Sequence, residues 1–315
     1  MHFIAIDLGG TITKIGLLKD DRIVCFSTIA SHIDSGFIDT LKELTSVINH
    51  LMYKSSIHKT ELSGVGLAFP GLVDYKKKKV ISTNDKFNDA IAFDISGWVK
   101  ENWDVPFYMD NDARLATVGE WQYGAGMGYD NLVMMTIGTG IGTGVILNGK
   151  ILHGKHYQAG SLGGHFVLDY KGRTCSCGNK GCVEALASSF FLPKIIKDNS
   201  EVSSLFKTKF RQYDFKLIFT LAAQGDKDAL LIRNECMDVW SAALITYIHA
   251  YDPEVFVIGG GIMNSADVII PYIESRLHNY AWCPSGEVPV QVSKLGDQAA
   301  LYGLNYCLTN KIEKK

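Results

Sequence analysis

One short stretch of the chain holds four residues whose types suit a metal ion. His165, Cys175, Cys177 and Cys182 lie in a glycine-rich run, residues 159–184, that has neither a helical nor a strand-like hydrophobic period. One imidazole and three thiolates form a ligand set for a tetrahedral zinc ion. The alternative is a group of small buried thiols or a disulfide pair, but buried cysteine favours apolar neighbours, and these lie among Ser, Asn, Lys and Gly. The sequence therefore predicts a structural zinc site that holds a loop in place.

Two turns rich in glycine and threonine suit a polyphosphate. The apolar run HFIAIDL, which includes Asp7, is followed by Gly9-Gly10-Thr11, and the run GTGIGTG, residues 138–144, separates two further apolar runs. Backbone amides, a hydroxyl and a cation-holding carboxylate are the groups that bind phosphate together with Mg²⁺. Each turn alone could be an ordinary hairpin turn. Together they could bind a triphosphate from two sides.

Neither turn fits the common nucleotide motifs. No Gly-Lys-Ser/Thr follows, so the Walker pattern is absent, and GTGIGTG leads into a strand where a dinucleotide fingerprint requires a helix. A third turn, in VIGGG, ends another apolar run and suits the nucleoside of the same nucleotide.

Three polar residues, Asp110, Asn111 and Asp112, stand where the strand-like run VPFYM gives way to a helix start. A helix N-cap would explain one of them but not all three. A carboxylate here can act as a general base toward a substrate hydroxyl, and the neighbouring amide can orient the same substrate.

The remaining chain supplies the elements that would position these residues. Short apolar runs predict strands at HFIAIDL, IGLL, RIVCFST, LSGVGLAF and VPFYM. Two more strands are predicted on either side of GTGIGTG in NLVMMTIGTGIGTGVILNGKIL, and another in EVFVIGGGIM. Helical spacing predicts helices at 39–53, 186–199, 202–211, 214–223, 226–250 and 297–306. The lysines of 76–79 are expected at a solvated hairpin tip.

Composition limits the possible classes of protein. The 315 residues are enough for two domains, and the net charge of −2 with no long basic block speaks against a nucleic-acid partner. The start has no basic segment and meets Asp7 early, so a signal peptide is not expected, and no apolar run reaches membrane-spanning length. Seven unevenly spaced cysteines fit a reducing cytoplasm, with thiols free or bound to metal.

The order of these motifs resembles the ROK family, which comprises bacterial sugar kinases and sugar-responsive repressors of the actin-like ATPase superfamily. DLGGT, DNDA, GTGIGTG, the His/Cys cluster and VIGGG follow one another from about Phe3 to Tyr306, and HFVLDYKGRTCSCGNKGCVE is the most specific piece. The resemblance implies an α/β fold of two actin-like (ribonuclease H-like) domains around a cleft. The small domain would be 1–112 plus 297–315, and the large domain 113–296, with a zinc-bound loop at 165–182.

The resemblance also implies an activity and its residues. ATP with Mg²⁺ would be the phosphoryl donor, and a hexose or hexose derivative the acceptor, usually at carbon six, with Asp112 as general base. The positions that match the family's sugar-binding residues are Gly71, Asn84, Asn111, Asp112, His165 and Glu184. The positions assigned to the nucleotide are Asp7, Gly9, Gly10, Thr11, Lys14, Gly138, Thr139, Gly140, Gly260 and Gly261. His165 would bind zinc through one ring nitrogen and face the sugar with the other. By analogy a homodimer is expected.

The chain departs from the family pattern near the sugar. Relatives usually carry Gly-Glu-x-Gly-His, but here Leu162, or Ser161 with a one-residue shift, takes the place of the Glu. The usual Pro-Asn-Leu is also altered, to residues 83–85. Because neither Leu162 nor Ser161 is a carboxylate, the sugar hydroxyls that the family's Glu would bind would lose their acceptor. The sequence therefore predicts an acceptor that differs from free glucose near the anomeric end: a glycoside, a ketose, an amino or N-acyl sugar, or a cyclitol.

Two alternatives compete with a kinase. A sugar-responsive repressor would carry a DNA-binding module ahead of the first turn, but Asp7 already lies in that turn. A catalytically silent sugar-binding or regulatory protein is disfavoured by the intact Asp112 and both phosphate turns. ATP consumption with candidate sugars separates these classes.

Overall fold

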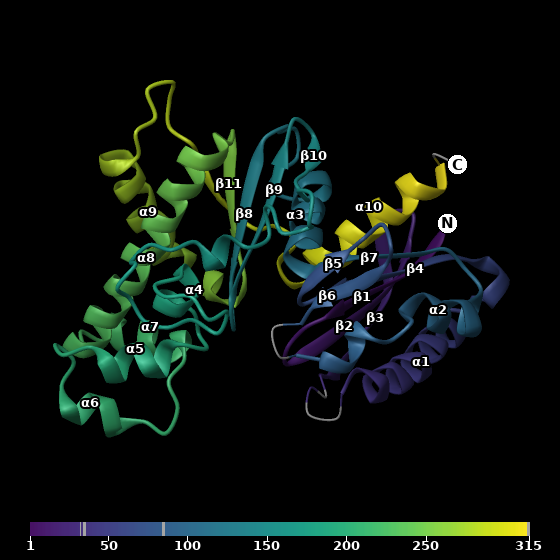
Figure 1. The fold of residues 1–315 in the computed structure, drawn as a ribbon, viewed down its shortest axis with the longest axis horizontal. Helices are drawn as coiled ribbons and strands as arrows, with labels where there is room; N and C mark the ends of the chain where they lie inside the picture. The colour runs from purple at the N-terminus through teal and green to yellow at the C-terminus, as the bar shows by residue number, and fades with distance from the viewer. Residues whose placement is uncertain (32, 34–35, 84–85, 314–315) are drawn as a thin grey trace. The chain divides into compact units, whose positions relative to one another are not determined.

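The computed structural model describes residues 1–31, 33, 36–83 and 86–313, with side chains as far as residue 310. The chain divides into two compact units, each described here by itself (Figure 1). The first comprises residues 1–128, 151–159 and 297–315, and the second comprises 129–150 and 160–296. This division places residues 113–128 and 151–159 in the first unit, whereas the sequence assigned them to the large domain.

The first unit contains a mixed five-stranded sheet of order β3-β2-β1-β4-β7. Its strands are β1 (His2–Leu8), β2 (Ile12–Lys19), β3 (Arg22–Ala30), β4 (Leu62–Phe69) and β7 (Phe107–Asn111). The first three strands form an antiparallel meander, and β4 and β7 run parallel to β1. The carboxyl ends of β1, β4 and β7 therefore share one edge, where ligands bind in open parallel sheets. The predicted lysine-tipped hairpin is confirmed as β5 (Leu72–Asp74) and β6 (Lys79–Ser82).

Helices cover both faces of this sheet. They are α1 (Phe37–Lys54), α2 (Ile95–Trp103), α3 (Asp112–Tyr123) and α10 (Ala299–Glu313), the last extending beyond the helix predicted at 297–306. Side chains alternate along β1: Ile4 and Ile6 join the core cluster that includes α1, while Phe3 and Ala5 join the one that includes α10. Figure 1 shows α1 and α10 on opposite sides of the strands. Because both faces of the sheet are buried, the sequences of these strands are nearly continuous apolar runs.

The second unit contains another five-stranded sheet, of order β10-β9-β8-β11-β12. Its strands are β8 (Leu132–Ile137), β9 (Ile141–Leu147), β10 (Lys150–Ile151), β11 (Val255–Gly259) and β12 (Val290–Val292). β8 and β9 form an antiparallel hairpin, and β11 runs parallel to both β8 and β12. The carboxyl ends of β8 and β11 carry the second and third glycine turns.

Helices make up most of the rest of the second unit. They are α4 (Val183–Ala187), α5 (Leu192–Asp198), α6 (Ser204–Lys209), α7 (Phe215–Ala223), α8 (Lys227–Tyr251) and α9 (Ala266–Tyr280). The long α8 packs against α4, α7 and α9, with Trp240 fully buried and its Nε1 donating to the Ala187 carbonyl at 2.9 Å. No helix within the described ranges is both long enough and apolar enough to cross a membrane.

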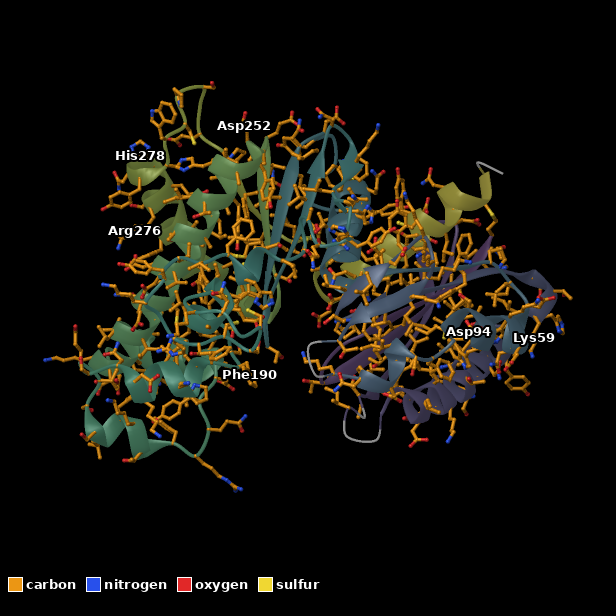
Figure 2. All side chains as sticks on the ribbon, in the orientation of Figure 1. Lys59, Asp94, Phe190, Asp252, Arg276 and His278 are labelled. Atoms are coloured by element: carbon orange, nitrogen blue, oxygen red, sulfur yellow. The ribbon has the colours of Figure 1, made fainter. Side chains whose placement is uncertain are left out.

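The single helix predicted at 186–199 is wrong, because the chain leaves the helical path after α4 and re-enters it at α5. Between them, the amides of Ser189 and Phe190 donate to the carbonyls of Gly138 and Thr139 at 3.2 and 3.0 Å. The hydrogen bonds that a continuous helix would keep for itself go to the second glycine turn instead. Phe190 itself is 65% exposed beside that turn (Figure 2).

Candidate functional site

The first glycine turn joins β1 to β2. The Gly9 amide donates to the Asp7 carbonyl at 3.1 Å, and a Cβ at Gly9 would lie only 2.4 Å from the Ile12 carbonyl oxygen, so this close approach requires glycine. Lys14 pairs with Asp7 in the β1–β2 register and places its Nζ 3.3 Å from that carboxylate. Burial raises the pKa of Asp7, and the charge of Lys14 opposes this rise. The structure thus brings Asp7, Gly9 and Lys14 together, with Lys14 already paired to a carboxylate.

Asp112 lies at the first position of α3, directly after β7. Asn111 is the helix N-cap: its Oδ1 accepts from the Arg114 amide at 3.1 Å, and its Nδ2 donates to the Gly71 carbonyl at 3.1 Å and to Asp112 Oδ1 at 2.8 Å. Asn111, Asp112 and Gly71 therefore form one connected group. Gly71 is required there, since a Cβ would lie 2.3 Å from the Ser82 carbonyl oxygen.

The Asp112 carboxyl has a perturbed acidity. Burial first, and then the negative charge of Asp7, raise its pKa to about 6. The Ala113 amide, the charge of Lys86 and the Asn111 side chain oppose this rise. Coupling between Asp7 and Asp112 fits the topology, because both stand at the shared edge of parallel strands. A carboxylate of this kind suits proton transfer near neutral pH.

Asp110, the first of the three polar residues, has a structural role. It is 2% exposed and lies 3.1 Å from Arg114 Nη1 and 2.7 Å from His153 Nε2. The fully buried Arg114 also donates to the carbonyls of Leu152, Tyr157 and Ala159 at 3.3, 2.6 and 3.0 Å. This network fixes the start of α3 to residues 151–159. Sequence reasoning missed it, although Asp110 and Arg114 stand four residues apart.

The predicted metal ligands come together in the second unit. The ligand atoms of His165, Cys175, Cys177 and Cys182 all lie within 4.8 Å of one another. A tetrahedral zinc ion requires S···S separations of about 3.8 Å and N···S separations of about 3.6 Å, from its usual bond lengths. Cys177 Sγ and Cys182 Sγ are 3.7 Å apart, and His165 Nδ1 is 3.6 Å from Cys175 Sγ. The donor set and its spacing fit zinc.

The protonation state of the cysteine thiols affects metal binding by this cluster. Burial raises the pKa of the Cys175 and Cys182 thiols. Zinc binds thiolates, so metal binding at this site would release protons.

Glu184 links the metal cluster to the second glycine turn. Its Oε2 accepts from the Ile141 amide at 3.0 Å, and its Oε1 accepts from Ser176 Oγ at 3.3 Å. A Cβ on Gly140 would lie 2.4 Å from Oε2, so the carboxylate packs directly on the turn. Within the turn, the Gly138 amide donates to the Gly140 carbonyl at 3.0 Å.

The third glycine turn meets the end of β8. Gly260 has a φ of +96°, and a Cβ there would lie 2.2 Å from the Ile137 carbonyl oxygen. Both features require glycine. A Cβ at Gly261 would meet no atom within 4 Å, and Thr139 in the neighbouring turn is exposed. The structure therefore brings the second and third turns together at one end of this sheet.

Two further predicted positions concern the sugar. Asn84 lies outside the described residues. Leu162 precedes a short 3₁₀ turn, Gly163–His165, and its carbonyl accepts from the His165 amide at 2.9 Å. Ser161 is 9% exposed, whereas Leu162 is partly exposed. Of the two candidates for the missing Glu, Leu162 is the one that reaches the surface.

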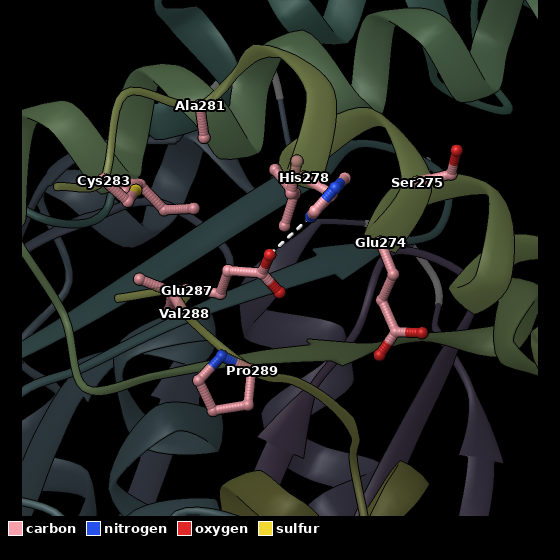
Figure 3. A pocket seen from close by; sticks show the side chains of 10 residues that line it. Glu274, Ser275, His278, Ala281, Cys283, Glu287, Val288 and Pro289 are labelled. Carbon is pink, nitrogen blue, oxygen red and sulfur yellow. Dashed lines mark hydrogen bonds and ion pairs between the residues drawn. The ribbon is translucent and has the colours of Figure 1, made fainter. Parts of the chain in front are cut away.

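A pocket of about 680 Å³ lies elsewhere in the second unit, next to α9 (Figure 3). Ile248, Leu277 and Pro289 are among its apolar walls, and His278 and Glu287 pair at its rim at 2.5 Å. None of the residues predicted from the sequence lines it. This pocket therefore lies apart from the predicted chemistry.

The two mixed sheets, with glycine turns at their strand ends, define an α/β protein with the actin-like ATPase fold. In accord with this, the glucokinase from Streptomyces griseus, solved in complex with glucose and AMPPNP, superposes with a TM-score of 0.83 at 24% identity, covering 98% of this chain and 100% of that one. The chain belongs to the ROK family, whose profile matches residues 3–311.

Relatives within the family carry different functions. The glucokinase of Thermotoga maritima is 29% identical over 320 residues, which cover 99% of this chain and 98% of the relative. The xylose repressor of Bacillus subtilis is 27% identical over 306 residues, which cover 96% of this chain and 76% of the repressor. Membership of the family therefore leaves both an enzyme and a regulator to be considered.

Proposed function

We propose that this protein is an ATP-dependent sugar kinase that transfers the γ-phosphate to the carbon-six hydroxyl of a hexose or hexose derivative. The observation that carries the proposal is Asp112, whose pKa is raised to about 6 and which lies in electrostatic contact with Asp7 at the first glycine turn. A base and a phosphate turn at one strand edge are what phosphoryl transfer to a hydroxyl requires. The relatives named glucokinase support the same class of reaction.

Asp112 would act as the general base. Its carboxylate accepts the hydroxyl proton as the hydroxyl oxygen forms a bond to the γ-phosphorus. The bond from that phosphorus to the β,γ-bridging oxygen breaks, and ADP leaves with the electron pair. A base of this kind contributes a factor of about 10² to 10⁴. Asn111, held by the Gly71 carbonyl, would orient the acceptor through its amide.

The nucleotide and metal roles follow from the turns and the cysteine cluster. The amides of Gly10 and Thr11 would hold phosphate oxygens at the first turn, which Gly9 allows the chain to make, and the turns at Gly138 and Gly260 would contact the nucleotide as well. Magnesium would neutralise phosphate charge near Asp7. The zinc ligands His165, Cys175, Cys177 and Cys182 form a closed set, so zinc would be structural.

We further propose that the acceptor differs from free glucose near its anomeric carbon. Leu162 is partly exposed beside the turn that carries His165, and it offers no acceptor to a hydroxyl. The candidates are a glycoside, a ketose, an amino or N-acyl sugar, or a cyclitol. His165 and Glu184 are assigned to the remaining hydroxyls by the family resemblance.

The test is ADP release with ATP, Mg²⁺ and a panel of hexoses, hexosamines, glycosides and cyclitols. At least one acceptor is expected to give sugar-dependent ADP release that Asp112→Asn abolishes. Leu162→Glu is expected to raise kcat/KM for glucose, relative to the other acceptors, by at least tenfold. Leu162→Met should leave the order of the acceptors by kcat/KM unchanged. If glucose gives by far the highest kcat/KM with the wild-type protein, the proposal about the acceptor fails and the kinase assignment stands.

A non-catalytic sugar-binding protein is the second candidate. The similarity to xylose repressors favours it, since sequences of this type also serve as regulators. Sugar binding seen by calorimetry, with no ADP release from any acceptor in the panel, would decide for this candidate.

A further inference from the structure

Lys86 lies over the first glycine turn, although no sequence motif pointed to it. A Cβ built on Gly10 would be 3.1 Å from Lys86 Nζ, 3.5 Å from its Cε and 3.8 Å from its Cδ. The end of the lysine side chain therefore lies along Gly10, in the space that any other residue would fill. The side chain is half-buried.

The backbone at Lys86 and after it is anchored. The Lys86 amide donates to the Thr83 carbonyl at 3.1 Å. The next residue, Phe87, is 2% exposed and packs against the rings of Phe37 and Phe69. Two residues further on, Asp89 accepts from the Phe37 amide at 2.9 Å, which fixes this segment to the start of α1. Lys86 is thus held in place by core contacts.

The charge of Lys86 acts on the proposed base. It opposes the rise in the pKa of Asp112 that burial and Asp7 cause. Lys14, the other cation at this turn, is already paired with Asp7 at 3.3 Å. Within the described ranges, no carboxylate lies within ion-pair distance of Lys86 Nζ, so its ammonium can bind an anion that enters the turn.

We propose that Lys86 is a catalytic residue whose ammonium group binds the phosphoryl group in transfer, between the Gly9-Gly10 turn and Asp112. This inference rests on the proposed kinase function. As the bond to the acceptor oxygen forms and the bond to ADP breaks, negative charge stays on the three equatorial oxygens of the phosphoryl group. A fixed ammonium stabilises that charge without reorganisation. The same ammonium keeps Asp112 ionised and able to accept the proton.

The kinetic test compares Lys86→Met and Lys86→Arg with wild type, and uses Lys77→Met, at the exposed hairpin tip, as a matched control. Lys86→Met is expected to lower kcat about 100-fold, the usual effect of losing one such group, with little change in the KM for sugar. The kcat of Lys86→Arg should be at least tenfold higher than that of Lys86→Met, and the kcat of Lys77→Met should match wild type. If Lys86→Met keeps kcat within threefold of wild type, the inference is wrong while the kinase function stands.

The pH profile gives a readout that a merely structural role would not move. The groups that face Asp112 are Asp7, Lys86, Asn111 and the Ala113 amide. Loss of the Lys86 cation should shift the acid limb of kcat/KM to higher pH. An unmoved limb in Lys86→Met would contradict the inference.

Nucleotide binding separates this inference from the proposed function. Lys86→Met should weaken binding of a non-hydrolysable ATP analogue at least tenfold and leave the affinity for ADP unchanged, as measured by calorimetry with Mg²⁺ present. This comparison holds even if no sugar in the panel is phosphorylated, which would count against the kinase function alone. Equal affinities of Lys86→Met and wild type for the ATP analogue would overturn the inference.

Discussion

Replacing Asp112 with asparagine is expected to abolish turnover and, at neutral pH, to stabilise the protein. Asparagine is isosteric, and its side-chain oxygen can still accept from the Ala113 amide and from Asn111 Nδ2, the two donors that contact Asp112 Oδ1 at 2.8 Å. The substitution therefore removes a proton acceptor and a charge but keeps the local hydrogen bonds. Its effects on activity and on the free energy of unfolding can be separated.

The cost of the Asp112 carboxylate to the free energy of unfolding follows from the shift in its pKa. The Asp112 carboxyl titrates near 3.8 in an unfolded chain and at about 6 in the folded protein. A difference of about 2.2 units at about 1.36 kcal/mol per unit gives about 3 kcal/mol as an upper bound, because the carboxyl is partly reached by water. Below pH 4 both states are protonated, so Asp112 contributes nothing. Between pH 4 and 6 the folded protein keeps a proton that the unfolded chain has lost, so stability falls as pH rises, and above pH 6 the whole cost is present.

Urea unfolding of wild type and Asp112→Asn at pH 4, 5, 6 and 7.5 measures this cost. The variant should gain about 1 to 3 kcal/mol at pH 7.5 and nothing at pH 4, while its kcat falls at least about 100-fold. Asp94→Asn, at the N-cap of α2, is the control, because Asn caps a helix as well as Asp does. A stability difference that stays constant from pH 4 to 7.5, or a variant less stable at pH 7.5, would refute the reasoning.

Three further perturbations test other parts of the structure. Wild type is expected to contain zinc by elemental analysis, and Cys182→Ser should lose this metal and expose residues 165–182 to limited proteolysis; an unchanged metal content would contradict the ligand assignment. Arg114→Met should cost about 3 to 5 kcal/mol in urea unfolding because it removes the buried guanidinium that pairs with Asp110 and leaves three carbonyls without their donor, and a loss under 1 kcal/mol would contradict this. Gly260→Ala should weaken binding of an ATP analogue at least tenfold, because alanine fits neither the positive φ nor the contact with the end of β8, whereas Gly261→Ala, which faces open space, should bind normally.

Much of the fold could be read from local patterns. Strands appeared where apolar runs ended in Gly, Asp or Asn, and the turns after β1, β8 and β11 fell where the sequence placed them. Tight turns depend mainly on the residues within them, so they need little knowledge of the rest of the chain. Asp112 could be found for the same reason, since it stands at a strand-to-helix junction marked by its own neighbours.

Hydrogen bonds between distant segments of the chain could not be predicted from the sequence. The break between α4 and α5 depends on carbonyls of Gly138 and Thr139, about 50 residues earlier in the chain. The network of Asp110 and Arg114 depends on the path of residues 151–159, which carry no regular hydrophobic period. Helical spacing located α4 and α5 within one predicted helix but could not show that the amides between them bond elsewhere.

Lys86 shows a different limit. A lysine in a polar stretch of sequence is ordinarily solvated, and the composition of that stretch predicts no function for it. Its position over Gly10 arises because Phe87 is buried against Phe37, which is a tertiary contact. The glycine was recognised as a place where a ligand could approach, but the structure shows that a side chain of the protein already approaches it.

Glu184 joins two features that the sequence treated separately. It stands two residues after Cys182, a predicted zinc ligand. Its carboxylate accepts both from Ser176, which lies between Cys175 and Cys177, and from the Ile141 amide at the second glycine turn. The backbone that carries the metal ligands therefore also sets the position of a carboxylate that binds this turn. Fixing one loop with a metal ion restricts the other through two hydrogen bonds, without any metal ligand having to touch a nucleotide. In this arrangement the cluster of His165, Cys175, Cys177 and Cys182 is part of the framework that shapes the second turn.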